Sequence, residues 1–434
     1  MTSTDMISTD MTSTDFSVKY LNIKENKNNL DFEISGNNEY GLNKTIINAI
    51  RRTLLTDIDT VAFNPEDIII KTNNSALHNE FMKHRISLIP LYIEPEDYYK
   101  NYLFILKVKN TDKSIMSIRA NDFEIYELKD EIKKKIEEQN KLQYISDEDN
   151  IFKNLNNISL EYYNLDKPLS NSKKKEIFRP FEFNKEFSYF LLTELKLTGS
   201  DDDIQELEIY CSPSIGRSRQ HARFNNLSKV VYSFKKNKEI FDKVVEDNIK
   251  INKIKGGDVA SYRKSLELKE GERYFYKDSI NEPYWYNFSI TSNHVKTCKE
   301  VYLQSLDILI DRLTHIIENF KTMVSDPEES LFSFDRLKNE MTYQIIMLKE
   351  DDTTGNMIQA HMVNKFMDNK SIIQVSGYKK PHPLTNLIVF NLMINPTEYT
   401  ELQKKTYIAE FFTKVCKDLI DILDIMKREA SKKL

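Results

Sequence analysis

The segments YLQSLDILIDRLTHIIENF (Tyr302–Phe320) and IAEFFTKVCKDLIDILDIM (Ile408–Met426) share the pattern that decides the fold. In both, large apolar residues recur at intervals of 4, 3, 4, 3 and 4 residues, which predicts a helix with a narrow apolar seam. Two such helices in one molecule can bury each other. The alternative is that each seam packs on its own sheet. The residues expected in the helix pairing are Leu306, Leu309, Leu313, Ile316, Phe320, Phe412, Val415, Leu419, Ile422 and Met426.

A strand, helix, strand plan precedes each long helix. Period-two alternation predicts strands at 16–20, 30–34 and 284–290 in the first copy, and at 341–347, 371–378 and 387–394 in the second. Apolar residues at every fourth position from Leu42 to Leu54 predict a helix, and a second helix is expected from about Gly355 to Asp368. These patterns indicate an α+β fold in which two units, each an antiparallel sheet with long helices, form a pseudo-two-fold pair.

An inserted segment interrupts the first copy. Asn64-Pro65 is predicted to break the chain and to begin a mostly β inserted domain, residues 64–275. The expected organisation is a disordered tail at 1–15, a discontinuous dimerisation domain at 16–63 and 276–322, the insertion, a linker at 323–338 and a second dimerisation domain at 339–434. The charged stretches 127–176 and 235–273 are expected to be solvated helices or loops without a direct function.

Composition excludes several classes of function. Only 9 of 434 residues are glycine, which disfavours Rossmann and P-loop folds. The net charge of −5 disfavours free-standing nucleic-acid binding, because a chain that neutralises many phosphates is normally basic. Cys211, Cys298 and Cys416 are too far apart for a structural zinc site and are interpreted as reduced thiols, so no metal and no cofactor are predicted. No apolar run is long enough for a membrane span, which favours an intracellular aqueous compartment.

Few residues are candidates for chemistry. Asp201, Asp202 and Asp203 form a carboxylate cluster of the kind that holds catalytic metals, but they lie between two alternating segments and are interpreted as a hairpin turn. His221 lies among Arg217, Arg219 and Arg223, and nearby positive charges lower the pKa of an imidazole. This basic loop could bind an acidic protein partner or nucleic acid, or face solvent.

Four parts of the chain, taken in order, resemble one family. They are NAIRRTLLTDIDTVAF (Asn48–Phe63), NNSALHNEFMKHRISLIPL (Asn73–Leu91), GRSRQHARFNNLSKVVYSF (Gly216–Phe234), and EDDTTGNMIQAHM (Glu350–Met362) followed by SGYKKPHPLTNLIVF (Ser376–Phe390). The first three resemble the third-largest subunit of eukaryotic RNA polymerase II, and the last resembles its eleventh subunit. The chain therefore looks like a fusion of two alpha-like RNA polymerase subunits, similar to the arrangement in large DNA viruses.

The resemblance implies a non-catalytic scaffold that docks the two largest polymerase subunits and small subunits of the tenth- and twelfth-subunit type. It implies DNA and RNA contact only through the complex, no membrane, no homodimer, and a location in the virion and host cytoplasm if viral, otherwise in the nucleus. The alternative is a nucleic-acid-binding transcription factor that uses residues 217–223. The expected partner-interface residues are Asn48, Arg51, Arg52, Glu80, His84, Arg85, Arg217, His221, Arg223, Gly355, Asn356, Tyr378, Lys379, Pro381, His382 and Pro383.

Physical chemistry suggests roles for some of these residues. The apolar residues Ile46, Ile50 and Leu54 take one face of their helix inward, which leaves Arg51 and Arg52 directed at least partly elsewhere. A planar guanidinium suits pairing with a partner carboxylate. His84 and Arg85 are expected in the last turn of a helix that Pro90 ends, where cations complement the helix dipole. Two prolines fix φ on both sides of His382, which predicts a rigid corner before a strand.

Overall fold

The computed structural model describes residues 16–26, 28–37, 42–95, 101–111, 114–134, 160–183, 185–197, 204–225, 227–254, 256, 258–293, 295–337, 342–367, 372–395 and 400–434. The chain divides into two compact units. Unit 1 comprises the described parts of Met1–Leu55, Leu227–Ser292 and Thr297–Leu434, and unit 2 those of Thr56–Asn226 and Asn293–Lys296. The expected disordered tail (1–15) and the expected turn at Asp201–Asp203 lie outside the described residues.

The first sheet of unit 1 is antiparallel, with the strand order β1-β2-β12-β11. Its strands are β1 (Lys19–Asn26), β2 (Asn29–Ser35), β11 (Leu227–Phe234) and β12 (Trp285–Ser292). Alternate residues of β12 are buried, whereas in β2 the polar Glu33 and Ser35 are buried as well as Leu30, Phe32 and Ile34. The rings of Phe32 and Phe288 stack across the two strands with 5.3 Å between their centroids. β12 shows the half-buried alternation that the sequence predicts.

The second sheet of unit 1 is also antiparallel, with the order β13-β14-β16-β15. Its strands are β13 (Phe332–Arg336), β14 (Thr342–Leu348), β15 (Ile373–Lys379) and β16 (Leu387–Ile394). The helix α8 (Asp352–Lys365) packs on β15 and β16, and Asp351 caps it by accepting from the backbone N–H of Thr353 at 2.9 Å.

The two sheets belong to repeats of one topology. The first repeat runs β1, β2, α1 (Lys44–Thr56), β11, β12 and α7 (Cys298–Ser325), and the second runs β13, β14, α8, β15, β16 and α9 (Glu401–Lys433). Each strand occupies the equivalent place in its own sheet. The interruption therefore lies between α1 and β11, which is the stretch that forms unit 2.

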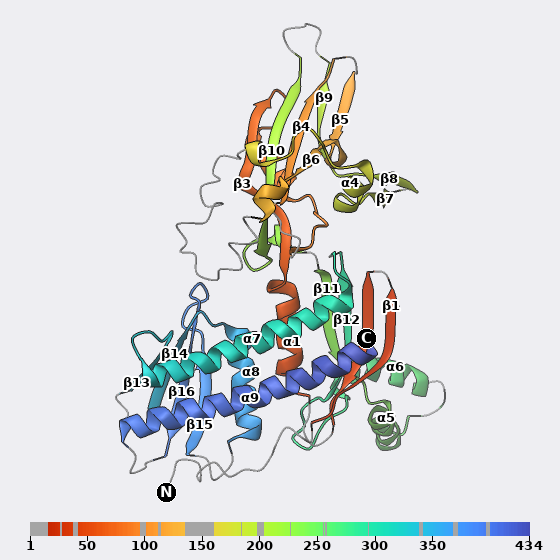
Figure 1. Ribbon diagram of the computed structural model, residues 1–434. Helices are drawn as coiled ribbons and strands as arrows, with labels where there is room; N and C mark the ends of the chain where they lie inside the picture. The colour runs from red at the N-terminus through yellow and green to blue at the C-terminus, as the bar shows by residue number, and fades with distance from the viewer. Residues whose placement is uncertain are drawn as a thin grey trace. The chain divides into compact units, whose positions relative to one another are not determined.

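The long helices α7 and α9 pack against each other (Figure 1). They are antiparallel. Lys299 Nζ near the start of α7 donates to Ser431 O near the end of α9 at 3.2 Å, and the ring of Phe320 near the end of α7 packs on the ring of Phe412 in the first half of α9, with 4.7 Å between the centroids. Both helices begin with a capping box, at Thr297 and Thr400. All ten residues expected in the helix pairing are buried.

Each long helix also contacts the edge strand of the other repeat. The hydroxyl of Tyr20 in β1 donates to Met426 O of α9 at 3.3 Å. Reciprocally, Phe320 of α7 packs edge-on against Phe332 of β13, with 5.1 Å between ring centroids. The sheets and the helix pair thus form one continuous core, so packing on a sheet and pairing between helices occur together.

Unit 2 is mostly β. One sheet has the order β3-β10-β4-β6, formed by β3 (Asp59–Asn73), β4 (Tyr102–Lys109), β6 (Glu124–Glu127) and β10 (Glu206–Arg217). Two further pairs are β5 (Ile115–Arg119) with β9 (Leu191–Lys196), and β7 (Phe181–Phe183) with β8 (Glu186–Ser188). The helices are α2 (Asn79–Ser87) and α4 (Asn171–Ile177). Its core combines aliphatic side chains with the rings of Phe63, Phe104, Phe123 and Phe178. The rings of Phe63 and Phe104 meet edge to face, with 4.9 Å between their centroids.

The prediction of an α+β fold is confirmed. The predicted break at Asn64-Pro65 is wrong, because β3 continues through it. Its register against β10 shifts there instead, because Phe63 lies opposite Pro213 and Ile68 lies opposite Cys211. This irregularity accommodates Pro65, which has no N–H to donate to a neighbouring strand.

Two boundaries differ from the expected ones. The predicted insertion ran to residue 275, whereas Leu227–Ser292 clusters with unit 1 because β11 pairs with β12. The helices α5 (Lys238–Asn252) and α6 (Asp258–Glu270) fall in that stretch and bury only Val245 and Leu266. The expected linker 323–338 is shorter in the structure, since α7 extends to Ser325 and β13 begins at Phe332.

Candidate partner interface

The helix α1 presents the first group of predicted interface residues. Its buried face holds Ile46, Ile50 and Leu54, whereas Asn48 and Arg51 are half-buried. Arg51 donates to Asn48 Oδ1 through Nε at 3.0 Å and Nη2 at 2.9 Å. These bonds along one helix turn hold the guanidinium against α1, so Asn48 orients Arg51.

α8 and β15 approach each other closely at Gly355 and Tyr378, and this approach explains why position 355 is a glycine. A Cβ atom on Gly355 would lie 2.8 Å from Tyr378 Cδ2 and 3.0 Å from Ile388 Cδ1. Burial raises the pKa of Tyr378, Asp352 adds to the increase, and the positive charge of Arg52 opposes it. The glycine therefore lets α8 approach β15 closely, because a side chain at position 355 would collide with the Tyr378 ring.

A polar recess lies between α1 and α8. It has a volume of about 380 Å³ and is lined by residues of both helices, with Tyr232 and Glu282 beside them. Asn48 and Asn356 both line this α1–α8 recess, and each is the fifth residue of its helix. The Oγ1 of Thr45 is buried with no hydrogen-bond partner among the described residues. The recess therefore combines equivalent positions of the two repeats.

The Pro381-His382-Pro383 segment forms the turn between β15 and β16. His382 organises this turn: its carbonyl accepts from Thr385 N at 3.2 Å, and its Nδ1 accepts from Leu384 N at 3.2 Å. Lys379, both prolines and His382 are exposed, and Leu384 is 87% exposed. The turn thus presents a large apolar side chain to solvent on a rigid backbone.

In unit 2, α2 carries Glu80 in its first turn and His84 and Arg85 in its last turn. All three side chains are exposed. Arg85 Nη2 donates to Leu191 O at 2.6 Å, which fastens α2 to β9. Two large apolar residues of this segment, Phe81 and Leu88, are also exposed, at 67% and 54%. These residues give α2 a mixed apolar and charged outer face.

The basic loop after β10 folds back on the start of β3. Arg217 donates to Asp59 through Nε at 2.6 Å and Nη2 at 3.3 Å, and Arg219 Nη2 lies 2.8 Å from Asp57 Oδ1. Arg223 Nη1 donates to Phe63 O at 3.4 Å and to Asn64 Oδ1 at 3.2 Å. The three guanidinium groups are therefore held by their own chain.

Two further contacts explain the conformation of the basic loop. Burial lowers the pKa of His221, and the charges of Arg223 and His84 lower it further, so the ring accepts a hydrogen bond from Arg223 N at 3.2 Å. Gly216 lies against the Phe224 ring, and a Cβ atom there would lie 2.4 Å from Phe224 Cε2. The glycine and the aromatic residue allow the loop to close on itself.

Sequence reasoning missed a buried charge cluster that joins the repeats. Arg312 of α7 pairs with Glu350 Oε2 at 3.2 Å and with Asp351 Oδ1 at 3.1 Å, next to the start of α8. Burial raises the pKa of Glu350, and Arg312 and a 2.8 Å hydrogen bond from Thr354 oppose that increase. The available signal was an arginine one position before the seam residue Leu313, together with the acidic pair Glu350-Asp351.

A second polar contact joins α8 to α9. His361 Nε2 lies 2.6 Å from Asp418 Oδ2, and Lys365 Nζ lies 3.5 Å from the same oxygen. Burial lowers the pKa of His361. Burial alone would raise the pKa of Asp418, but His361 and Lys365 outweigh it and the net shift is downward.

Neither a metal-ligand cluster nor a membrane-spanning helix occurs among the described residues. Within the ranges given above, no three or more His, Cys, Asp or Glu side chains come together as metal ligands. In the same part of the chain, no helix has both the length and the apolar character that crossing a bilayer requires.

Sequence comparison adds independent evidence. No protein-family model matches the chain. It is 23% identical over 323 residues to DNA-directed RNA polymerases I and III subunit rpac1 of Dictyostelium discoideum, a match that covers 70% of this chain and 82% of the relative. It is 33% identical over 76 residues to the RPAC1 subunits of Homo sapiens and Bos taurus, but this match spans only 20% of those relatives. Homology to RPAC1 thus supports the interpretation of this chain as an alpha-like subunit of a DNA-directed RNA polymerase.

Proposed function

We propose that this chain is a non-catalytic scaffold that assembles a DNA-directed RNA polymerase, and that it joins two alpha-like subunits in one polypeptide. The observation that carries this proposal is the α1–α8 recess, where Asn48 and Asn356 occupy equivalent helix positions in two repeats of one topology. A surface built by both repeats exists only when they are paired. A partner that binds this surface would therefore bind only the molecule in which the two repeats are paired.

The reciprocal contacts of the long helices support a pseudo-two-fold relation. α9 contacts β1 while α7 contacts β13, and α7 and α9 pack on each other. A covalent link keeps the second repeat close to the first, so pairing does not depend on protein concentration. We infer that the fusion replaces a dimerisation step with intramolecular folding.

The proposed partners are the two largest polymerase subunits, with small subunits of the tenth- and twelfth-subunit type, and DNA and RNA are contacted only through the complex. The residues proposed to face the large subunits are Asn48, Arg51 and Arg52 of α1, Asn356 of α8, and the turn that carries Leu384. In unit 2, the outer face of α2 is the proposed contact. The resemblance to fused viral subunits further suggests a viral source, with action in the virion and host cytoplasm; otherwise the polymerase would work in the nucleus.

Affinity purification of the tagged full-length chain from its native cells tests this function. The expected result is recovery of two large subunits and of DNA-dependent RNA synthesis in the purified fraction. The double variant N48D/N356D places two negative charges in the recess and should reduce recovery of the large subunits at least about tenfold. Recovery of the intact chain without large subunits, or RNA synthesis by the chain alone, would overturn the proposal.

A matched control separates this loss from misfolding. N287D changes a polar residue on the exposed side of β12, where Asn287 donates to Ser233 at 3.2 Å, and should leave recovery of the large subunits unchanged. The alternative of direct nucleic-acid binding through residues 217–223 is less favoured, because Arg217 and Arg219 already pair with Asp59 and Asp57.

A further inference from the structure

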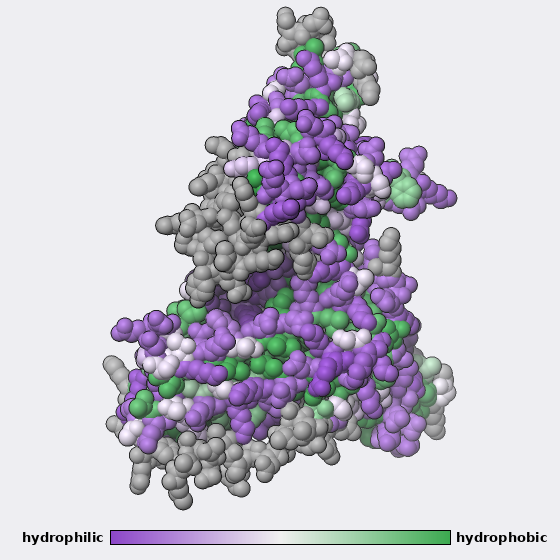
Figure 2. Space-filling model, in the orientation of Figure 1, coloured by the Kyte–Doolittle hydropathy of each residue, from purple (hydrophilic) through white to green (hydrophobic). Residues whose placement is uncertain are grey.

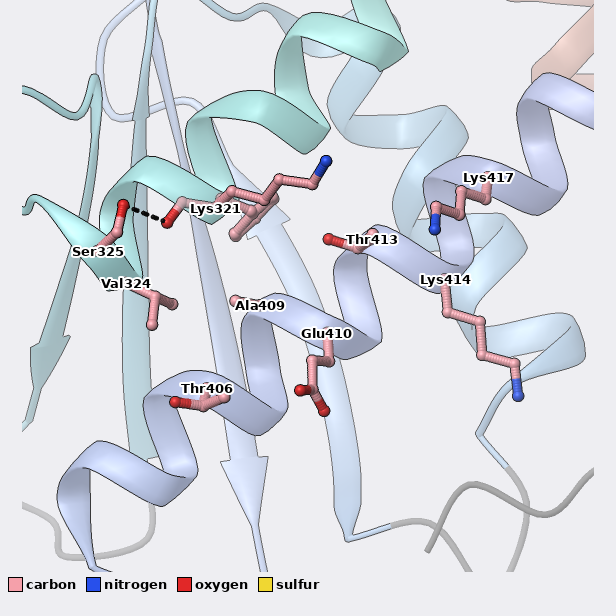
Figure 3. A pocket seen from close by; sticks show the side chains of 10 residues that line it. Lys321, Val324, Ser325, Thr406, Ala409, Glu410, Thr413, Lys414 and Lys417 are labelled. Carbon is pink, nitrogen blue, oxygen red and sulfur yellow. Dashed lines mark hydrogen bonds between the residues drawn. The ribbon is translucent and has the colours of Figure 1, made fainter. Parts of the chain in front are cut away.

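A groove runs between the second half of α7 and the first half of α9 (Figure 3). Its volume is about 690 Å³, within the range of about 300–1,000 Å³ that ligand sites occupy. Val324 of α7 provides accessible apolar lining, whereas Phe320 and Ala409 lie beneath the groove as buried residues. The remaining lining residues of this α7–α9 groove are Lys321, Ser325, Thr406, Glu410, Thr413, Lys414 and Lys417.

The charges that line the groove are predominantly positive. Lys321, Lys414 and Lys417 outnumber the single carboxylate of Glu410. None of the three ammonium groups pairs with a carboxylate within 4.0 Å among the residues that the structure describes. Figure 3 shows Lys321 extending from α7 and Lys417 from α9 towards the gap between the helices. Lys414 Nζ lies 5.7 Å from the centroid of the Phe366 ring, so the positive charge that faces the gap comes from Lys321 and Lys417.

The dimensions of the groove favour a helical peptide. The lining residues of α9 extend from Thr406 to Lys417, which corresponds to about 17 Å at 1.5 Å per residue, or roughly three turns. An amphipathic helix of that length places apolar residues at i, i+3 or i+4, and i+7 on one face. On the surface view, hydrophobic residues emerge between hydrophilic rows along these helices (Figure 2).

We propose that the α7–α9 groove binds an acidic amphipathic helix of a protein partner. The apolar face of that helix packs on Val324 and on the aliphatic stems of the lining lysines, and its carboxylates pair with Lys321 and Lys417. Apolar contact supplies most of the affinity, whereas the lysines select acidic over basic helices, because charges at an interface mainly set specificity. Nucleic acid fits less well, since the floor is apolar and Glu410 repels phosphate.

The probe for this proposal is a fluorescein-labelled 15-residue helical peptide with Leu at positions i, i+3, i+4, i+7 and i+11 and Glu elsewhere. Fluorescence anisotropy with the full-length chain measures its dissociation constant. A second peptide carries Lys in place of every Glu. The acidic peptide should bind at least about tenfold more tightly than the basic peptide, and added salt should reduce the difference.

Charge reversal then tests the site itself. The variant K321E/K417E should bind the acidic peptide at least about tenfold more weakly and should gain affinity for the basic peptide. The control K433E changes an exposed lysine outside the groove on the same helix and should bind like the parent chain. V324D should weaken the binding of both peptides, because it places a charge on the apolar surface of the groove. Equal binding of the two peptides by the parent chain, or unchanged binding by K321E/K417E, would overturn the proposal.

Discussion

At the scale of single residues, two glycines differ in the space that surrounds them: Gly355 is tightly packed, whereas Gly377 is open. Gly355→Ala would place a methyl group 2.8 Å from the Tyr378 ring, and overpacking of this kind costs typically about 1–3 kcal/mol. Gly377→Ala is the matched control at the residue immediately before Tyr378, because a Cβ atom there would meet nothing within 4 Å. We expect urea unfolding to show the larger loss of stability for Gly355→Ala. Equal losses would contradict the close approach of α8 and β15.

The buried His361 predicts a dependence of stability on pH. Burial lowers the pKa of this imidazole below its ordinary value of 6.5, so the unfolded chain binds a proton that the folded chain resists. The free energy of unfolding should therefore fall as the pH decreases below about 6.5. Asp418 acts in the same direction at lower pH, because its depressed pKa means that stability is lost as its carboxylate is protonated.

Thermal melts between pH 7.5 and 5.0 measure this dependence. His361→Gln should flatten the pH dependence of the melting temperature between pH 6.5 and 5.0, although it lowers stability at neutral pH by removing the contact with Asp418. His315→Gln changes an exposed histidine of α7 and should keep the parent slope. A parent chain whose melting temperature does not change below pH 6.5 would contradict the assignment of a buried neutral imidazole.

At the scale of elements, Arg312 joins α7 to the start of α8. Its side chain is 16% exposed, and those of its partners Glu350 and Asp351 are 6% and 11% exposed. Arg312→Ala leaves two buried carboxylates without their cation, and breaking a buried pair in this way costs about 3–5 kcal/mol. Urea unfolding measures the loss. The exposed pair Arg336–Glu401 is the matched control, and Arg336→Ala should cost at most about 1 kcal/mol.

At the scale of the whole molecule, the link between the repeats should be dispensable once the chain is folded. A protease site inserted between Asp326 and Leu331, in the connection from α7 to β13, should be cleaved without separation of the fragments on a native sizing column. The reason is that the α7–α9 seam buries large apolar residues from both sides. Cleavage of the same chain carrying Leu313→Glu should release the fragments. Separation of the unmodified fragments would contradict intramolecular pairing as the source of stability.

The sequence determined by itself the elements and their apolar faces. The 4, 3, 4, 3, 4 spacing located α7 and α9, and alternation located three strands of each sheet, because periodicity follows directly from helix and strand geometry. Alternation did not locate β11 or β13. The sequence also marked Gly355 and Tyr378 as notable positions, but not as neighbours.

Only the tertiary structure decided which elements meet. Asn48 and Asn356 are 308 positions apart and line one recess, and Arg312 finds Glu350 across the two repeats. Strand pairing also decides two other features. The chain returns to the first sheet at β11 rather than after residue 275, and β3 continues through Pro65. Periodicity shows the face that a segment buries, but the partner of that face is set by packing among distant segments, which local spacing does not encode.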